Sequence, residues 1–266
     1  MSLLQLAVLA VVQGLTEFLP ISSSGHLILV PHLLGWPDQG LTIDVAAHVG
    51  TLVAVLIYFW RDVLKMATGL LRLLRGRFDP GAKLALYLLI ATIPALIVGY
   101  LVDRYAAESF RSVTLVASTM IGFALVMYIA DRSGLTVRRV EHMTLGQAVI
   151  IGFAQTLAFI PGTSRSGITM VAARFMGYER VEAARFSFLL SIPAICAAGI
   201  WKGYGLYRDG GDAGLDAAAI VVALSAVTGV IAIAILMRFL PRWGFMPFIL
   251  YRLAFGAALF AWIFFG

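Results

Sequence analysis

Two short polar stretches interrupt long apolar runs, PISSSGH at 20–26 and PGTSRSG at 161–167. In the first, Ser23 lies three residues before His26, and Glu17 stands just upstream in the apolar run. A hydroxyl beside an imidazole, with a carboxylate to orient it, is typical of an activated nucleophile. Because ionisable side chains inside apolar segments are costly, a functional role is their default interpretation. We therefore predict that Ser23, His26 and Glu17 are catalytic; the alternative is a Glu17–His26 pair that only holds the chain together.

The second stretch carries Arg165 among hydroxyls and glycines. Each stretch ends an apolar helix and opens a shorter one, whose first N–H groups and positive dipole end attract anions. Arginine grips phosphate in bidentate fashion. The two stretches together therefore predict a site for a phosphate or another oxyanion.

Ligands for a metal ion are few. Glu17, with His26, is the only nearby combination, and the chain has no cysteine–histidine cluster. A hard cation such as Mg²⁺ or Ca²⁺ needs only one or two carboxylates plus substrate phosphates. The sequence thus leaves a divalent cation open, with Glu17 as its protein ligand, and indicates no other cofactor.

The elements that position these residues follow from composition. Of 266 residues, 61% are apolar and 13% charged, against roughly 25% charged in soluble domains, which indicates an all-α polytopic membrane protein. Two apolar runs, near 1–19 and 144–160, break at the polar stretches and predict re-entrant hairpins. Six further runs are long enough to span the membrane; they cover roughly 43–60, 84–102, 112–130, 186–202, 217–237 and 246–265.

An internal repeat relates the two hairpins. A shift of 142 residues places Gln13 on Gln155, and Ser23 on Arg165. The single domain, 1–266, then divides into halves of about 1–132 and 141–266, each with one hairpin and three spans. Because three is odd, the second half must be inserted upside down relative to the first, and the two hairpin tips meet near the membrane midplane.

The distribution of basic residues predicts the orientation. With both termini outside, the inner loops 61–83, 131–143, 174–185 and 238–245 hold fourteen of the twenty Lys and Arg residues. The net charge of +6 is then a topology signal that touches anionic lipid, and nucleic acid is not an expected partner. The first hairpin, which enters from outside, favours a site open to the outer leaflet. The oligomeric state stays open between monomer and homodimer.

Three other residues need an interpretation. His48 lies four residues after Asp44, and we favour a paired interfacial role with Asp44 over a place in the cavity wall. Arg252, about two turns into the last span, is adequately explained by snorkelling, with a cavity-facing role as the alternative. The lone cysteine, Cys196, allows no disulfide within the chain and suggests packing.

A transporter is the competing class, because broken helices that meet at the midplane are common in secondary transporters. The same anion site could carry or flip a lipid phosphate without hydrolysis. The asymmetry of the repeat favours an enzyme, since Glu17, Ser23 and His26 fall on Phe159, Arg165 and Ile168 in the second half.

At these residues the chain resembles the bacterial undecaprenyl-diphosphatase, or bacitracin-resistance, family. The likeness lies in QGLTEFLPISSSGH at 13–26 and PGTSRSGIT at 161–169, and it covers the whole chain. This resemblance implies a phosphatase of the bacterial inner membrane that converts undecaprenyl diphosphate, a polyprenyl diphosphate lipid, to undecaprenyl phosphate. It further implies that the reaction recycles the lipid carrier for wall polymers and underlies bacitracin resistance. Some members carry Glu where Gln13 stands, which leaves Glu17 as the single carboxylate.

The mechanism that we expect on this basis has Ser23 attack the terminal phosphorus and His26 remove the serine proton, with Glu17 as orienting group. Direct attack by water is the main variant. The residues expected to hold the diphosphate are Arg165, Gln13, Thr163, Ser164, Ser166, Gly162 and Gly167.

Overall fold

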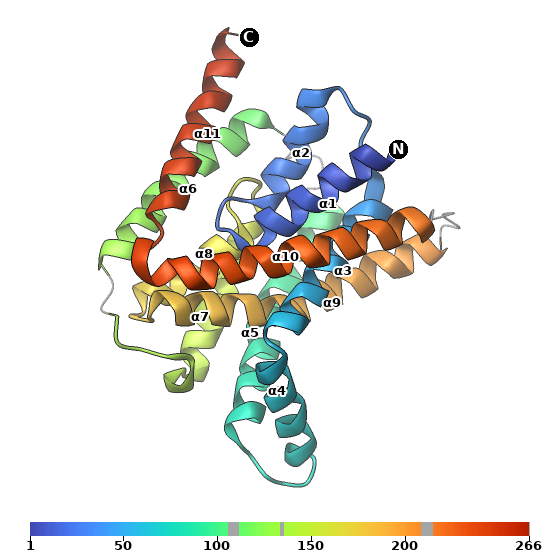
Figure 1. Ribbon diagram of the computed structural model, residues 1–266. Coiled ribbons are helices and arrows are strands. Elements are labelled where there is room, and N and C mark those ends of the chain that lie inside the picture. The colour runs from blue at the N-terminus through green and yellow to red at the C-terminus, as the bar shows by residue number, and fades with distance from the viewer. Residues whose placement is uncertain (106–111, 134–135, 209–214, 266) are drawn as a thin grey trace.

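The computed structural model describes residues 1–105, 112–133, 136–208 and 215–265, and the fold there is all-α, as predicted (Figure 1). The α-helices are α1 (Leu3–Phe18), α2 (Ser23–Leu34), α3 (Gly40–Tyr58), α4 (Trp60–Leu73), α5 (Pro80–Tyr105), α6 (Val113–Ser133), α7 (Leu145–Gln155), α8 (Arg165–Phe175), α9 (Arg180–Arg208), α10 (Leu215–Trp243) and α11 (Met246–Phe265). Two short 3₁₀ turns, η1 (Val140–His142) and η2 (Thr156–Phe159), flank α7.

Six of these helices are long and apolar enough to cross a membrane, and all six were predicted. They are α3, α5, α6, α9, α10 and α11. Some of these helices are a few residues longer at their ends than the predicted runs. Helix α5, with 26 residues, is about 39 Å long and therefore longer than the hydrocarbon layer of about 30 Å is thick. The chain is therefore a multi-pass membrane protein.

The segment after α3 differs from the prediction. The basic run 61–83 was expected to be an inner loop, but its first part forms α4, which packs against the start of α5 and projects from the bundle with it (Figure 1). Gly69 and Gly81 allow this packing, because a Cβ on either would collide with backbone of the other helix. The sequence signal was an amphipathic period hidden among the basic residues.

Both apolar runs that precede the polar stretches fold back as hairpins, α1 with α2, and α7 with α8. Their entering helices begin alike: Ser2 and Gln5 form a capping box on α1, and Thr144 and Gln147 form one on α7, again 142 residues apart. At 16 residues, α1 is about 24 Å long, too short to span. The inverted relation of the halves and the re-entrant placement in a membrane stay predictions.

Small residues bring α10 against α1 and α3, and Figure 1 shows α10 passing in front of α3. A Cβ on Gly50 of α3 would lie 2.5 Å from the carbonyl oxygen of Val222, and one on Gly14 of α1 would lie 2.8 Å from that of Ser225. Such close backbone approach is how helices associate in lipid. It matters for function because α1 and α3 both carry residues of the site described below.

The replacement Gly50→Ala should lower the unfolding temperature in detergent, because its methyl group must push α10 away, at a cost of about 1–3 kcal/mol. Gly122→Ala, in α6, is the matched control: a Cβ there meets nothing within 4 Å, and alanine is the better helix former. Intrinsic fluorescence during a thermal ramp measures both. Equal unfolding temperatures for the two variants would contradict the packing argument.

Candidate active site

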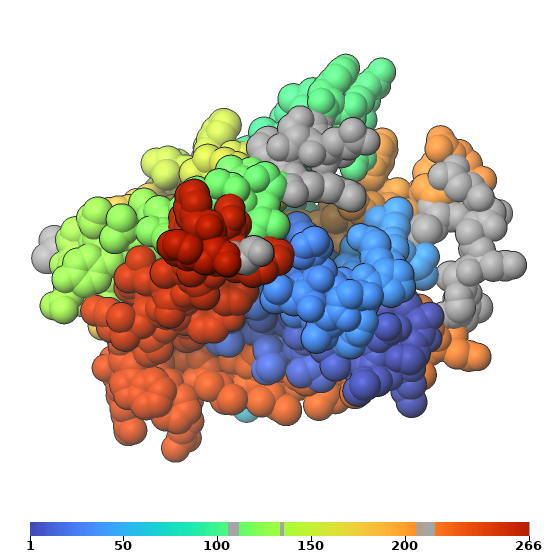
Figure 2. Space-filling view, turned by 90° about the horizontal axis from the view of Figure 1, so that it is seen from above, coloured from blue at the N-terminus to red at the C-terminus, as the bar shows by residue number. Residues whose placement is uncertain are grey.

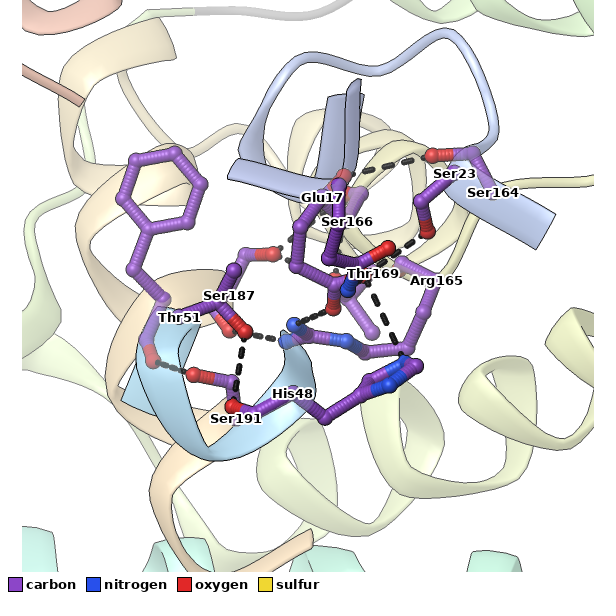
Figure 3. Close-up of polar contacts among 12 residues, drawn as sticks. Glu17, Ser23, His48, Thr51, Ser164, Arg165, Ser166, Thr169, Ser187 and Ser191 are labelled. Atoms are coloured by element: carbon purple, nitrogen blue, oxygen red, sulfur yellow. Dashed lines mark hydrogen bonds and ion pairs between the residues drawn. The ribbon is translucent and has the colours of Figure 1, made fainter. Parts of the chain in front are cut away.

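Glu17 lies at the centre of a buried polar cluster (Figure 3). Its Oε2 atom accepts a hydrogen bond of 2.7 Å from the Ser23 hydroxyl and one of 3.2 Å from Gln13 Nε2. Its Oε1 atom accepts one of 2.7 Å from Arg165 Nη2, and this contact is also an ion pair. The Glu17 side chain is 6% exposed, so these partners replace water around the charge. Three residues predicted from two distant motifs therefore meet at the carboxylate of a fourth, Glu17.

The two loops before α2 and α8 share one local geometry. Ser22 and Ser164 are the N-caps, with φ of 74° and 75°, a left-handed conformation that few non-glycine residues adopt. Each N-cap hydroxyl accepts the N–H of the glycine three residues on and lies 3.2 Å from the hydroxyl two residues on. The tight turn leaves the residue after the cap, Ser23 or Arg165, at the start of its helix and aimed at Glu17.

Donors for an anion remain at both helix starts. Among the described residues, the N–H groups of Ser23, Ser24, Arg165 and Ser166 have no hydrogen-bond partner, as expected for the first turn of a helix. Arg165 also donates from Nη1 to the Ser187 carbonyl at 3.1 Å, so two of the roughly five guanidinium N–H groups are engaged. The rest can receive an oxyanion.

Five residues expected to hold the diphosphate contact one another, Arg252 and the first tip. The carbonyl oxygens of Gly162 and Thr163 accept from Arg252, and Gly162 has φ of 90° in a space that a Cβ would overfill. Ser164 accepts the N–H of Gly167, and Ser166 lies against Ser164 and donates to the Leu19 carbonyl. These contacts shape the loop; a direct bond from its hydroxyls to phosphate stays a prediction.

His26 does not take the expected place beside Ser23. Its Nδ1 lies 2.7 Å from the carbonyl oxygen of Ser22, its Nε2 lies 2.6 Å from the Tyr251 hydroxyl, and its ring stacks on Phe255 with centroids 5.0 Å apart. Among the contacts of the described residues, none joins His26 to Ser23. The aromatic side chains of α11 draw the imidazole away, and the carboxylate of Glu17 is the partner of Ser23 instead.

The preferred interpretation of His48 was also wrong. Its Nδ1 lies 2.7 Å from the main-chain oxygen of Asp44, while the Asp44 carboxylate accepts from Gln39 Nε2 at 2.9 Å. Its Nε2 lies 4.0 Å from Glu17 Oε2, and the side chain is 41% exposed. His48 therefore lines the site, the alternative that the sequence left open.

Arg252 does not snorkel. It is fully buried and donates to five carbonyl oxygens, at 2.7 to 3.3 Å. The acceptors belong to the first hairpin tip, the second tip and α6; they are Pro20, Gly162, Thr163, Thr119 and Met120. One guanidinium thus ties the two tips to each other and to α6. The only sequence signal was an arginine inside an apolar span.

The donor set does not form a resident metal site. Within the described part of the chain, no three His, Cys, Asp or Glu side chains cluster. Glu17 is the single carboxylate of the site, and both its oxygens already accept hydrogen bonds. A hard cation would need most of its oxygens from another source.

Comparisons with known proteins find a matching family model and relatives of full length. A family model described as bacitracin resistance protein BacA matches residues 6–258. An undecaprenyl-diphosphatase of Roseobacter denitrificans is 49% identical over 261 residues, which cover 97% of this chain and 98% of that protein. Undecaprenyl-diphosphatase 1 of Rhodospirillum rubrum is 47% identical over 273 residues, with 100% and 97% covered. An undecaprenyl-diphosphatase of Maricaulis maris is 50% identical over 264 residues, with 97% and 98% covered.

The replacement Arg252→Met should destabilise the protein by about 3–5 kcal/mol, because it leaves buried carbonyl groups without donors. Arg238→Met, on an exposed position of α10, is the control and should change the unfolding temperature little. Denaturation in detergent, followed by tryptophan fluorescence, measures both. If Arg252→Met unfolded like Arg238→Met, the tips would not depend on this side chain.

Proposed function

The chain belongs to the bacitracin resistance protein BacA family, and from this we propose that it is a membrane phosphatase that hydrolyses undecaprenyl diphosphate to undecaprenyl phosphate and phosphate. The reaction recycles the lipid carrier of cell-wall synthesis and confers bacitracin resistance. The observation that carries the proposal is the contact of Ser23 and Arg165 with one carboxylate, Glu17, at the starts of two helices. Relatives of full length that are named diphosphatases favour this reaction over transport by the same site.

Binding comes first in the mechanism that we propose. The terminal phosphoryl group lies between the starts of α2 and α8, where the free N–H groups and the remaining guanidinium N–H groups of Arg165 receive its oxygens. Phosphoryl transfer asks a protein mainly for such positioning and charge stabilisation. Arg165 then divides its hydrogen bonds between phosphate and Glu17, which weakens its hold on the carboxylate and leaves Glu17 better able to accept a proton.

Ser23 is the nucleophile in this scheme. Its Oγ forms a bond to the terminal phosphorus while the bond from phosphorus to the bridging oxygen breaks, and undecaprenyl phosphate leaves. The serine proton passes to Glu17 Oε2, 2.7 Å away in the resting site. Water then attacks the phosphoserine, the bond from Oγ to phosphorus breaks, and Glu17 returns the proton to Oγ while the water proton leaves with phosphate. Direct attack by water, with Ser23 as a binding group, is the variant.

Ser23→Ala and Glu17→Gln should each lower the rate of phosphate release from undecaprenyl diphosphate by about 10²–10⁴, because one removes the nucleophile and the other the proton acceptor. Ser118→Ala, an exposed hydroxyl on α6, is the control and should match the wild type. Phosphate release in detergent measures all four proteins, and the same assay with EDTA decides whether a Mg²⁺ or Ca²⁺ bound to the diphosphate is needed.

Near-wild-type activity in Ser23→Ala alone would show that water, and not Ser23, attacks the phosphorus. A folded wild type that releases no phosphate, with or without added Mg²⁺ or Ca²⁺, would overturn the proposal of a phosphatase and favour a carrier that uses the same anion site.

We further propose that the protein lies in the bacterial inner membrane with both termini outside and its site open to the outer leaflet. The supporting observation is that fourteen of the twenty basic residues fall in the four segments that this orientation places inside. His48 of α3 supports access from the outer side: it lies eight residues, or about 12 Å, from the start of the helix, and its side chain is partly exposed.

Labelling of single cysteines checks this orientation. In a Cys196→Ser background, Pro37→Cys, before α3, should react with a membrane-impermeant maleimide in spheroplasts, and Phe78→Cys, before α5, should react only after the membrane is opened. Both positions are exposed in the fold and leave the basic residues intact. The reverse pattern would place the termini and the site opening inside.

A further inference from the structure

His48 reaches the site from a helix that contains neither of the two polar stretches. It lies on α3, and its Nε2 faces Glu17 Oε2, the oxygen that also accepts the Ser23 hydroxyl (Figure 3). Its side chain is 41% exposed, against 6% for Glu17 and 16% for Arg165. His48 is therefore the most accessible ionisable group of the cluster, at its open edge.

The contacts of the ring fix which nitrogen faces the site. A carbonyl oxygen only accepts, so the 2.7 Å contact of Nδ1 with the main-chain oxygen of Asp44 places a hydrogen on Nδ1. The Asp44 carboxylate is engaged by Gln39 and does not compete for the ring. At 4.0 Å, Nε2 is too far from Glu17 Oε2 for a hydrogen bond. Nε2 is thus held toward the site without being used there.

The charges of the site leave a role for it. Arg165 and Glu17 neutralise each other, so a bound diphosphate meets little net positive charge from this pair. The other cation nearby, Arg252, donates its hydrogen bonds to five carbonyl oxygens and not to the site. His26 is turned away from the site toward Tyr251. Among the described residues, the ion-pairing groups within 4.0 Å of Glu17 are Arg165 and His48.

We propose that His48 is a phosphate-binding residue of this enzyme. When the diphosphate enters, the imidazole is protonated on Nε2 and donates to an oxygen of the terminal phosphoryl group, on the side of Glu17 away from Arg165. The phosphoryl group is then held by α2, α3 and α8 together, and α3 contributes through this one side chain. The proposal rests on the proposed function for its substrate, but the chemistry it requires is only that of a phosphate oxyanion.

Enzyme kinetics of His48→Ala and His48→Gln test the role. His48→Ala should raise the KM for undecaprenyl diphosphate about tenfold or more, the usual effect of losing a hydrogen bond to a charged group, and weaken inhibition by inorganic phosphate to the same degree. Its kcat should change less than about threefold, since the lost contact is formed in the bound ground state as well. Glutamine keeps a donor at similar reach without the charge, so His48→Gln should recover much of the affinity.

His32→Ala is the matched control, because His32 lies on the exposed side of α2 against Trp262 and should leave KM unchanged. An unchanged KM and unchanged phosphate inhibition in His48→Ala would overturn the proposal. A fall in kcat at constant KM would overturn it too, because His48 would then act in the chemical step.

A binding measurement separates this proposal from the proposed function. Inorganic pyrophosphate should raise the unfolding temperature of the wild type, and raise it less in His48→Ala, while the two proteins unfold alike without ligand. This result can be obtained even if the wild type hydrolyses nothing, in which case the function fails and the anion site stands. Equal shifts in both proteins would contradict the role of His48 while leaving the phosphatase intact.

Discussion

The two hairpin tips need hydrogen-bond donors where water does not reach, and Arg252 supplies them. Each tip breaks a helix and exposes carbonyl oxygens that no helical N–H satisfies, at a depth where an unpaired polar group costs several kcal/mol. A single guanidinium on α11 donates to three carbonyl groups of the tips and two of α6. Because the tips are fixed this way, Ser23 and Arg165 can meet at one carboxylate. The reactive cluster therefore depends on a residue that takes no part in the chemistry.

The two tips share a scaffold but not their chemistry. Both turn on a serine N-cap with positive φ, and both enter on a helix with a buried glutamine. Gln13 donates to Glu17, whereas the side-chain amide of Gln155, its counterpart in the repeat, has no hydrogen-bond partner among the described residues. The residue four positions after Gln155 is Phe159, where the first tip has Glu17. One tip thus carries the carboxylate and the serine that we propose as the nucleophile, and the other carries the cation, an asymmetry suited to bond cleavage.

Much of the fold could be predicted because its causes are local. Six apolar runs became six long helices, and hydroxyl–glycine stretches became N-caps, since hydropathy and capping act within a few residues. The repeat predicted that Ser23 and Arg165 occupy equivalent positions on the two tips, but not that both contact Glu17. The errors have a different cause: His26 and His48 were assigned to near neighbours and Arg252 to snorkelling, but the partners of all three are set by packing between helices. Tyr251, which turns His26 away, lies 225 residues along the chain.

The ion pair between Arg165 and Glu17 gives the resting site a reason to be stable. A free carboxylate and a free guanidinium in this buried place would each cost several kcal/mol of desolvation, and the pair offsets that cost while no anion is bound. In the proposed mechanism, a phosphate that enters offers Arg165 a second acceptor, so the guanidinium divides its hydrogen bonds between phosphate and Glu17 without ever being unpaired. Glu17 then faces the Ser23 hydroxyl with less positive charge beside it. The contact that stabilises the buried pair is therefore the one whose loosening, in the proposed mechanism, prepares Glu17 to accept a proton, so that substrate binding and proton acceptance are linked through a single arginine.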